Sequence, residues 1–301
     1  MKLSVVIPTL NAREELAGCL DSLAEHAPDA EVIVVNGPSA DGTTGMVRER
    51  DDVAVLVELA DRTINAARNA GIDRANGDVV AFLDHTVAVS GDWLDTLVTG
   101  IETAAVVTGP TKTQLETQPS MKQFEQRTIA GREVSYFNPG NVAFRREVLD
   151  ELDGFDEYLD IGGSRDVAHR LAGNEFDICW SDRMQVRQEV GTDGGERKTD
   201  WGQKYRSLSY RLVKNYHLRP SVIWRLLRHA GSDASIELRD VADGDTRPSQ
   251  WFGNGRAVVT GLAGGIRGGV GARRRDRTSR RNPRGRSSRA DRAVTVYDWR
   301  N

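Results

Sequence analysis

The residues after the first predicted strand limit the phosphate chemistry open to this chain. A dinucleotide-binding domain places G-x-G-x-x-G there, so that backbone N–H groups approach a pyrophosphate. The chain has Pro8-Thr9-Leu10-Asn11 instead, and G-x-x-x-x-G-K-[ST] occurs nowhere in it. The sequence therefore argues against nicotinamide, flavin and P-loop enzymes. A sugar nucleotidyltransferase is also disfavoured, because no glycine-rich triphosphate loop follows this strand.

Two charged side chains lie where they could meet a phosphorylated ligand. Arg68, in the stretch ARNAG, could hold a diphosphate through charge-assisted hydrogen bonds, although a solvated charge on a helix is the simpler alternative. Asp84 ends a predicted strand, where it could also cap the following turn. Each role depends on the elements that position these residues.

Strands alternate with helices through the first half of the sequence. Buried strands are predicted at 2–8, 31–36, 53–57 and 78–83, and helices at 13–27 and 62–75. This order predicts an α/β fold with a mostly parallel central sheet flanked by helices. Ligands of such sheets bind outside the carboxyl ends of the strands, so the loops after Ile7, Val35 and Leu83 should face the site.

The second half of the sequence predicts a smaller layer and a C-terminal appendage. Residues 141–180 contain strand and helix patterns, and residues 200–229 read as two helices broken at Pro220. Residues 231–247 are polar and acidic, and residues 271–292 are rich in Arg, Ser and Gly. That composition predicts a flexible tail.

Four stretches of the chain, in order, resemble the inverting glycosyltransferases of family 2, which have the GT-A fold. They are VVIPTLNAREELAGCLDSL, EVIVVNGPSADGT, ARNAGIDRANGDVVAFLD and GNVAFRREVLDELDGFDE. The resemblance covers roughly residues 1–180. It implies a GT-A domain over residues 1–230, with the nucleotide-sugar-binding half in 1–110 and the acceptor side in 111–230. An acidic linker and a basic, flexible tail would occupy residues 231–301.

The resemblance also assigns residues to the nucleotide-sugar donor, which would be a UDP- or GDP-sugar. The substrate-binding residues it implies are Pro8, Thr9, Asn11, Asn36, Arg68, Asp84, Gly140 and Asn141. The family usually has Asp where this chain has Asn36, but an amide can still pair with a uracil edge. The alternative is that Asn36 and Asp41 only cap a turn and the helix after it.

The chain departs from the family at two catalytic motifs. The family binds Mg²⁺ or Mn²⁺ with Asp-x-Asp, and this chain reads Asp84-His85-Thr86. The resemblance implies a divalent metal on Asp84 and Thr86, which would stabilise the leaving diphosphate. The family's base position is Ser164, which cannot act alone as a base at neutral pH. The predicted catalytic base is therefore Asp166, and its alternative is an acid at a helix N-terminus.

Charge divides the chain into an acidic body and a basic tail. Residues 251–301 hold 13 arginines and three aspartates, a net charge of +10, whereas residues 1–250 carry −13. The body has only six lysines, a composition that suits a salt-loving archaeon. Since no apolar run is long enough to span a bilayer, the tail predicts a cytoplasmic protein held peripherally on the membrane surface. The arginine-rich stretch of the tail, residues 271–292, contains no aromatic residue, so no nucleic-acid partner is expected.

Together these features predict transfer of a sugar to a lipid-linked acceptor, such as a dolichyl- or polyprenyl-phosphate saccharide of N-glycosylation or surface-glycan synthesis. The altered motifs leave a second hypothesis open. In it the chain is a non-catalytic relative that binds nucleotide sugars as a partner subunit.

Overall fold

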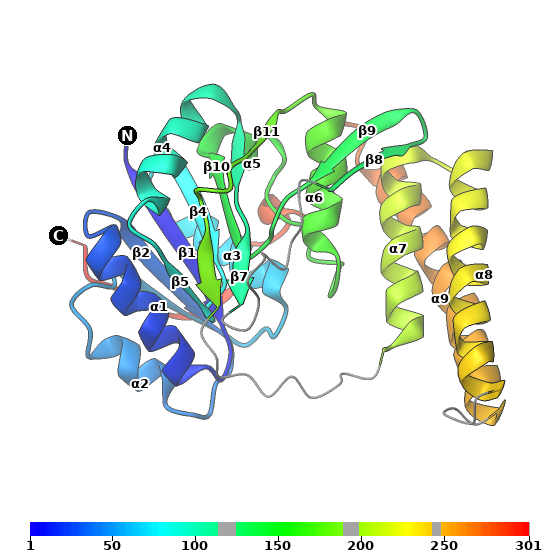
Figure 1. Cartoon of the computed structure of the whole chain (residues 1–301), viewed down its shortest axis with the longest axis horizontal. Coiled ribbons are helices and arrows are strands. Elements are labelled where there is room, and N and C mark those ends of the chain that lie inside the picture. The colour runs from blue at the N-terminus through cyan, green and yellow to red at the C-terminus, as the bar shows by residue number, and fades with distance from the viewer. Residues whose placement is uncertain (114–124, 189–198, 243–247, 301) are drawn as a thin grey trace.

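A computed structural model describes residues 1–113, 125–188, 199–242 and 248–300, and its centre is one eight-stranded sheet (Figure 1). The strand order is β11-β6-β10-β4-β1-β2-β3-β13. These strands are β1 (Leu3–Thr9), β2 (Glu31–Asn36), β3 (Val55–Leu59), β4 (Val79–Leu83), β6 (Val106–Thr108), β10 (Asn141–Arg145), β11 (Ile178–Trp180) and β13 (Ala293–Asp298). Strands β1 to β4 are mutually parallel, while β10 and β13 run antiparallel to their neighbours. The predicted α/β fold is confirmed.

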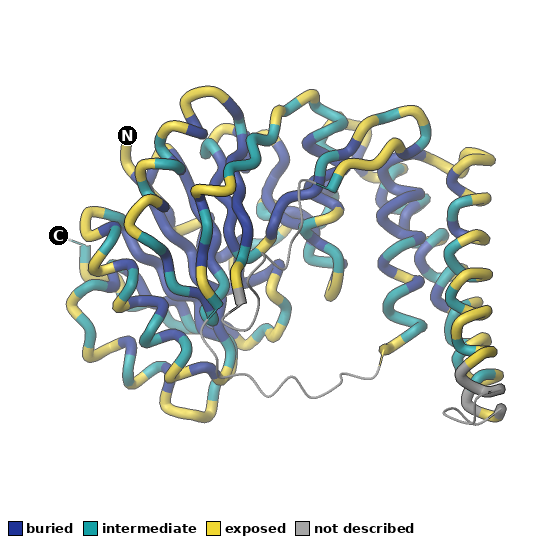
Figure 2. Tube along the Cα trace, viewed as in Figure 1, coloured by how far each residue is buried: buried dark blue, intermediate teal, exposed yellow. Residues whose placement is uncertain are grey.

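Helices cover both faces of this sheet because the strands are apolar on both sides. One face packs against α1 (Arg13–His26), α2 (Thr43–Arg48) and α4 (Trp93–Thr103). The other packs against α3 (Ile64–Arg74), α5 (Arg146–Glu151) and α6 (Gly163–Gly173). Neighbouring residues of β1 point to opposite faces, with Val6 in one core and Val5 in the other. The sheet is dark with buried residues in Figure 2.

Two small sheets accompany the central sheet. One contains β5 (Val87–Val89), β12 (Val186–Gln188) and β7 (Thr111–Thr113). The other is the hairpin of β8 (Glu125–Ile129) and β9 (Arg132–Tyr136). Beyond this hairpin stand α7 (Trp201–Tyr216), α8 (Pro220–Ala242) and α9 (Pro248–Arg275), which form a helical layer at one end of the molecule (Figure 1). The predicted break at Pro220 is confirmed, but the boundary predicted at residue 230 falls inside α8.

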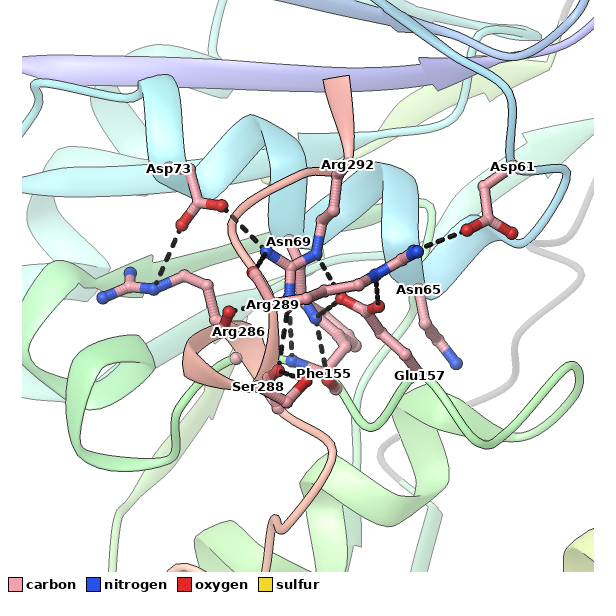
Figure 3. A network of polar contacts seen from close by, with 12 residues as sticks. Asp61, Asn65, Asn69, Asp73, Phe155, Glu157, Arg286, Ser288, Arg289 and Arg292 are labelled. Carbon is pink, nitrogen blue, oxygen red and sulfur yellow. Dashed lines mark hydrogen bonds and ion pairs between the residues drawn. The ribbon is translucent and has the colours of Figure 1, made fainter. Parts of the chain in front are cut away.

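The prediction of a flexible C-terminal tail is wrong for residues 248–300. They form α9, the short helix η1 (Arg286–Ser288) and β13, which completes the edge of the sheet beside β3. Arg286, Arg289 and Arg292 form ion pairs with carboxylates of the body, and Figure 3 shows this network around α3. The carboxylates that pair with these arginines are Asp61, Asp73, Asp150 and Glu157. Opposite charges that the sequence separates therefore meet in the fold.

The glycines of α9 allow it to pack closely against α7. A Cβ atom on Gly265 would lie 2.0 Å from the Ser209 Oγ and 2.2 Å from the Arg206 carbonyl oxygen. On Gly261, four residues earlier on the same face, it would lie 2.3 Å from the Gly202 carbonyl oxygen. The glycines of α9 thus permit a close helix–helix contact with α7.

The Gly265→Ala variant should unfold at a lower temperature than the wild type. Its added methyl group meets backbone oxygen, which cannot move aside, and overpacking of this kind costs about 1–3 kcal/mol. Gly255, on the same helix, is the matched control, because a Cβ there would have no described atom of another element within 4 Å. Gly255→Ala should be neutral or stabilising. Equal stabilisation by both variants in thermal unfolding would contradict the packing of α9 on α7.

Candidate functional site

A pocket opens at the carboxyl ends of β1 and β4 and is bounded by the first turns of α3. This strand-end pocket encloses about 120 Å³. It is lined by Pro8, Thr9, Leu10, Gly37, Asp61, Arg62, Thr63, Ile64, Ala67, Arg68, Leu83, Asp84 and His85. Four predicted substrate-binding residues, Pro8, Thr9, Arg68 and Asp84, therefore meet in one place. The Asp61–Thr63 wall was missed by the sequence analysis, although it follows a predicted strand as the other walls do.

Arg68 presents a guanidinium that forms no ion pair with the residues that the structure describes. It donates a 3.0 Å hydrogen bond to the Pro139 carbonyl oxygen and lies 5.0 Å from the centre of the Phe155 ring. Burial lowers the pKa of Arg68 to about 10, against the attraction of Asp84. Its Nε atom is buried without a hydrogen-bond partner, and so is the Thr9 Oγ1 atom. Both unsatisfied groups line the pocket, which indicates that a polar ligand completes it.

Asp84 lies at the pocket edge with a side chain 43% exposed. Its Oδ1 atom accepts hydrogen bonds from the Thr86 backbone N–H and hydroxyl, at 3.1 and 3.0 Å. Gly140 passes so close that a Cβ on it would lie 3.1 Å from the Asp84 Cβ. The structure therefore brings Gly140 to the predicted site as a close backbone neighbour of Asp84.

The donor set suits a weakly held divalent ion. Within the described ranges, no group of three or more His, Cys, Asp or Glu side chains is arranged to hold a metal. The Thr86 hydroxyl is engaged with Asp84, and the His85 Nδ1 atom lies 3.2 Å from the Pro8 carbonyl oxygen. Of the two pocket carboxylates, Asp61 is paired with Arg289 and Asp84 is accessible, so a metal on Asp84 would take most of its remaining oxygen ligands from a bound diphosphate and water.

Three predicted substrate-binding asparagines form hydrogen bonds within the protein through their side-chain amides. The Asn36 amide bonds to the Thr44 and Ser39 hydroxyls at 3.0 and 2.6 Å. The Asn11 Oδ1 atom accepts from the Ala40 backbone N–H at 2.8 Å. The Asn141 side chain joins the Trp93 indole to the Met184 carbonyl oxygen. Asn36 and Asn141 are buried, and none of the three lines the pocket. The structure thus favours the turn-stabilising alternative for Asn36.

The environment of Asp166 contradicts its prediction as catalytic base. Its carboxylate is fully buried, 2.7 Å from the Lys214 Nζ atom and 2.8 Å from the Arg170 Nε atom. Burial alone would raise the pKa of Asp166, but these two cations hold that pKa well below its ordinary value. Lys214 also pairs with the buried Asp156 at 2.7 Å. A buried carboxylate that is already doubly paired cannot take a proton from a substrate, so Asp166 instead joins α6 to α7.

The segment before α6 is held against the first turn of α3, next to residues that line the strand-end pocket. The Asn65 side chain, in the first turn of α3, donates to the Asp156 and Leu159 carbonyl oxygens at 3.2 and 2.5 Å. Gly163 packs directly on the same amide. Between these contacts lies Asp160, an exposed carboxylate that accepts a 3.1 Å hydrogen bond from the Gln203 Nε2 atom. Asp160 is thus the solvent-accessible acid beside the predicted base position.

Comparison with known proteins places this architecture. The profile of the family described as glycosyl transferase family 2 matches residues 4–153. Glycosyltransferase AglE of Haloferax volcanii is 29% identical over 53% of this chain and 58% of that protein. Glucosyl-dolichyl phosphate glucuronosyltransferase of the same organism is 27% identical over 64% of this chain and 65% of that protein. The chain thus spans less than two thirds of either relative.

Solved structures share the fold. The mannosyltransferase PcManGT of Pyrobaculum calidifontis, in complex with GDP-Man and Mn²⁺, matches with a TM-score of 0.55 and 18% identity, over 88% of this chain and 87% of that chain. S. aureus TarS 1–349, in complex with UDP-GlcNAc, matches with a TM-score of 0.58 and 20% identity, over 70% and 65%. At these identities the likeness shows the GT-A fold alone.

Proposed function

Because the chain belongs to glycosyltransferase family 2, we propose that it transfers a sugar, with inversion, from a nucleoside-diphosphate donor to a lipid-linked acceptor. The observation that carries the proposal is the strand-end pocket, where the unpaired Arg68 guanidinium and the Asp84 carboxylate face the same space. A diphosphate supplies oxygens for Arg68 and, through a divalent cation, for Asp84. The neighbours with GDP-Man or UDP-GlcNAc support this donor class.

The reaction needs few groups from the protein. The acceptor hydroxyl attacks the anomeric carbon of the donor sugar, and the bond from that carbon to the diphosphate oxygen breaks with its electron pair on the diphosphate. Arg68 stabilises the charge that develops on this leaving group, and Asp84 would hold a divalent cation that adds Lewis-acid stabilisation when bound. We propose that Asp160 takes the proton of the acceptor hydroxyl, because its carboxylate is exposed beside the first turn of α3.

A donor screen by thermal unfolding tests the binding half of this proposal. A UDP- or GDP-sugar should raise the unfolding temperature of the wild type, and Mn²⁺ should increase the shift, since a ligand that binds only the folded chain stabilises it by mass action. Asp84→Ala should lose the Mn²⁺-dependent part of the shift. Asp92→Ala is the control, because Asp92 is an exposed carboxylate away from the pocket. An undiminished Mn²⁺-dependent shift in Asp84→Ala would rule out this residue as the metal ligand.

A lipid-linked acceptor would bring the chain to a membrane surface. Apolar side chains available for such a contact lie on α8, outside the basic tail. Leu262 and Ile266, in the helix of the basic tail, pack against the core. Exposed apolar side chains gather on one face of α8, where Ile223, Trp224 and Leu227 are followed three turns later by Leu238. In the described ranges no helix is long and apolar enough to cross a bilayer. We propose that this α8 face lies on the membrane surface.

Positive charge beside the start of α8 supports an anionic lipid surface. Four arginines surround His217 and Leu218 in the turn between α7 and α8: Arg273, Arg274, Arg277 and Arg281. Burial and the neighbouring arginines lower the pKa of Arg273 to about 10, which indicates concentrated positive charge. Arginines at an anionic leaflet contribute about 1 kcal/mol each. The α8 face and this arginine cluster together would hold the protein beside a dolichyl- or polyprenyl-phosphate acceptor.

Flotation with anionic liposomes tests the attachment. The wild type should float at both low and high salt, because apolar side chains bind lipid even when salt screens the arginines. Trp224→Glu/Leu227→Glu should remain in the soluble fraction. Ile236→Glu is the matched control, because Ile236 is equally apolar and exposed on α8 but points away from the proposed face. Equal flotation of the two variants would exclude the α8 face as the anchor.

A further inference from the structure

A second, strongly basic pocket is lined by residues of α6, α7, α8 and the β8–β9 hairpin. Figure 1 shows the arrangement of these elements at one end of the molecule. This helical pocket has a volume of about 310 Å³. Its basic side chains are Arg127, Arg165, His169, Lys204, Arg211, Arg225 and His229. They come from four separate elements, so only the tertiary fold brings them together.

The carboxylates around the helical pocket are too few to balance this charge. Glu125 pairs with Arg127 and Arg165, at 2.6 and 3.1 Å. Asp233 pairs with Lys204 at 2.7 Å. Among the residues that the structure describes, neither Arg211 nor Arg225 has an ion-pair partner. The pocket therefore keeps an excess of positive charge that attracts an anion.

Arg211 is the group in most need of such an anion. Its side chain is 8% exposed, and its Nη1 atom lies against Gly162. Burial lowers the pKa of Arg211 to about 10, and its Nε atom is buried with no hydrogen-bond partner. Within the described ranges its guanidinium donates no hydrogen bond. A buried guanidinium in this state is unfavourable unless a ligand supplies the missing acceptor oxygens.

His169 adds a second unsatisfied atom to the same wall. It is fully buried on α6, and its Nδ1 atom lies 2.8 Å from the Tyr216 hydroxyl. Its Nε2 atom is buried without a partner. Burial, together with the charge of Arg211, lowers the pKa of His169 well below its ordinary value, so the ring is neutral. In the tautomer whose Nδ1 atom accepts from the Tyr216 hydroxyl, the Nε2–H is a hydrogen-bond donor towards the pocket.

The position of the helical pocket connects it to sugar transfer. Ile161 and Gly162 form part of its wall and directly follow Asp160. The other side of that segment is held by Asn65 at the first turn of α3, whose Ile64 and Arg68 line the strand-end pocket. The proposed proton acceptor thus lies between the two pockets, one suited to the donor and one left for the acceptor.

We propose that the helical pocket binds the phosphate or diphosphate group of the acceptor, with Arg211 as its ion-pair partner and the His169 Nε2–H as a neutral donor. This inference rests on the proposed function for the identity of the acceptor, but the anion site itself is independent of it. Phosphate oxygens can accept hydrogen bonds from both Arg211 and His169. The other arginines of the pocket and Lys204 would neutralise the charge of the phosphate group.

Titration with inorganic pyrophosphate in metal-free buffer tests the site without turnover. The wild type should bind pyrophosphate, and Arg211→Met should bind it at least tenfold more weakly. Arg228→Met should bind it as the wild type does, because Arg228 is an exposed arginine of α8 that lines neither pocket. Without anion, Arg211→Met should unfold at the same temperature as the wild type or higher, because it removes an unpaired buried charge. If Arg211 only stabilised the fold, Arg211→Met would unfold at a lower temperature than the wild type. Equal pyrophosphate affinity of wild type and Arg211→Met would overturn the site.

Competition then separates the acceptor from free phosphate. A polyprenyl phosphate in detergent should displace pyrophosphate from the wild type, whereas the uncharged polyprenol should not. In transfer assays Arg211→Met should raise the KM for a phosphate-bearing acceptor at least tenfold and leave the KM for the donor unchanged. Pyrophosphate binding that polyprenyl phosphate does not displace would overturn the acceptor assignment. Arg211-dependent displacement in a chain that transfers no sugar would support the site and contradict the proposed function.

Discussion

Replacing Asp160 with asparagine is expected to lower the rate of sugar transfer by about 10²–10⁴-fold, the range for loss of general-base catalysis. Asparagine keeps the size of the side chain and can still bond to Gln203, but it cannot accept the proton of the acceptor hydroxyl. Donor affinity should be unchanged, because Asp160 does not line the strand-end pocket. Single-turnover transfer and the donor-induced thermal shift measure the two quantities separately.

Two outcomes would contradict this assignment. An Asp160→Asn enzyme with the wild-type rate would show that another group takes the proton. A wild type that binds the donor and transfers sugar to no phosphate-bearing acceptor would favour the non-catalytic, nucleotide-sugar-binding hypothesis. The observation behind that hypothesis is that Ser164 occupies the family's base position while the nearby Asp166 is buried and paired.

The Lys214→Met variant is expected to lose about 3–5 kcal/mol of unfolding free energy, the cost of removing one partner from a buried ion pair. Lys214 lies between Asp156 and Asp166, each 2.7 Å away, and all three side chains are fully buried. Methionine fills similar space but leaves Asp156 without a cation and Asp166 with Arg170 alone. Urea unfolding of the purified, folded variant measures this decrease in unfolding free energy. Asp156→Asn, made with Lys214→Met, should recover part of it by removing the uncompensated charge, whereas Asp166 keeps its ion pair with Arg170.

The pH dependence gives this prediction a second measurement. The folded-state pKa of Asp166 is below its unfolded value, so its contribution to stability is fully present above the unfolded value and declines as the pH falls towards the folded value. The stability difference between wild type and Lys214→Met should therefore narrow in acid. A difference that stays constant from neutral pH down to about pH 3 would show that the loss comes from packing alone.

The sequence by itself determined the sheet and the place of the donor site. Apolar runs such as Val5–Ile7 and Val32–Val35 can only be buried strands once helices separate them, and strands β1 to β4 match their predicted ranges closely. Parallel strands bring their carboxyl-end loops together, so the loops that hold Thr9 and Asp84 were expected at one site, and the family resemblance added Arg68 to it. The spacing of apolar residues and the order of the elements are properties of the linear sequence, so the sequence alone can predict them.

The tertiary structure decided what each polar residue does. Asn141 and Asp166 have the residue types of ligand-binding groups, but neighbours 48 residues away in the sequence occupy their polar atoms. The arginines of the tail indicated disorder in the sequence, yet Arg289 and Arg292 are held by carboxylates more than 130 residues away. Arg211 shows the converse, because only the fold reveals that a buried cation has no described partner. Long-range pairing of charges depends on three-dimensional distance, which spacing along the chain does not encode.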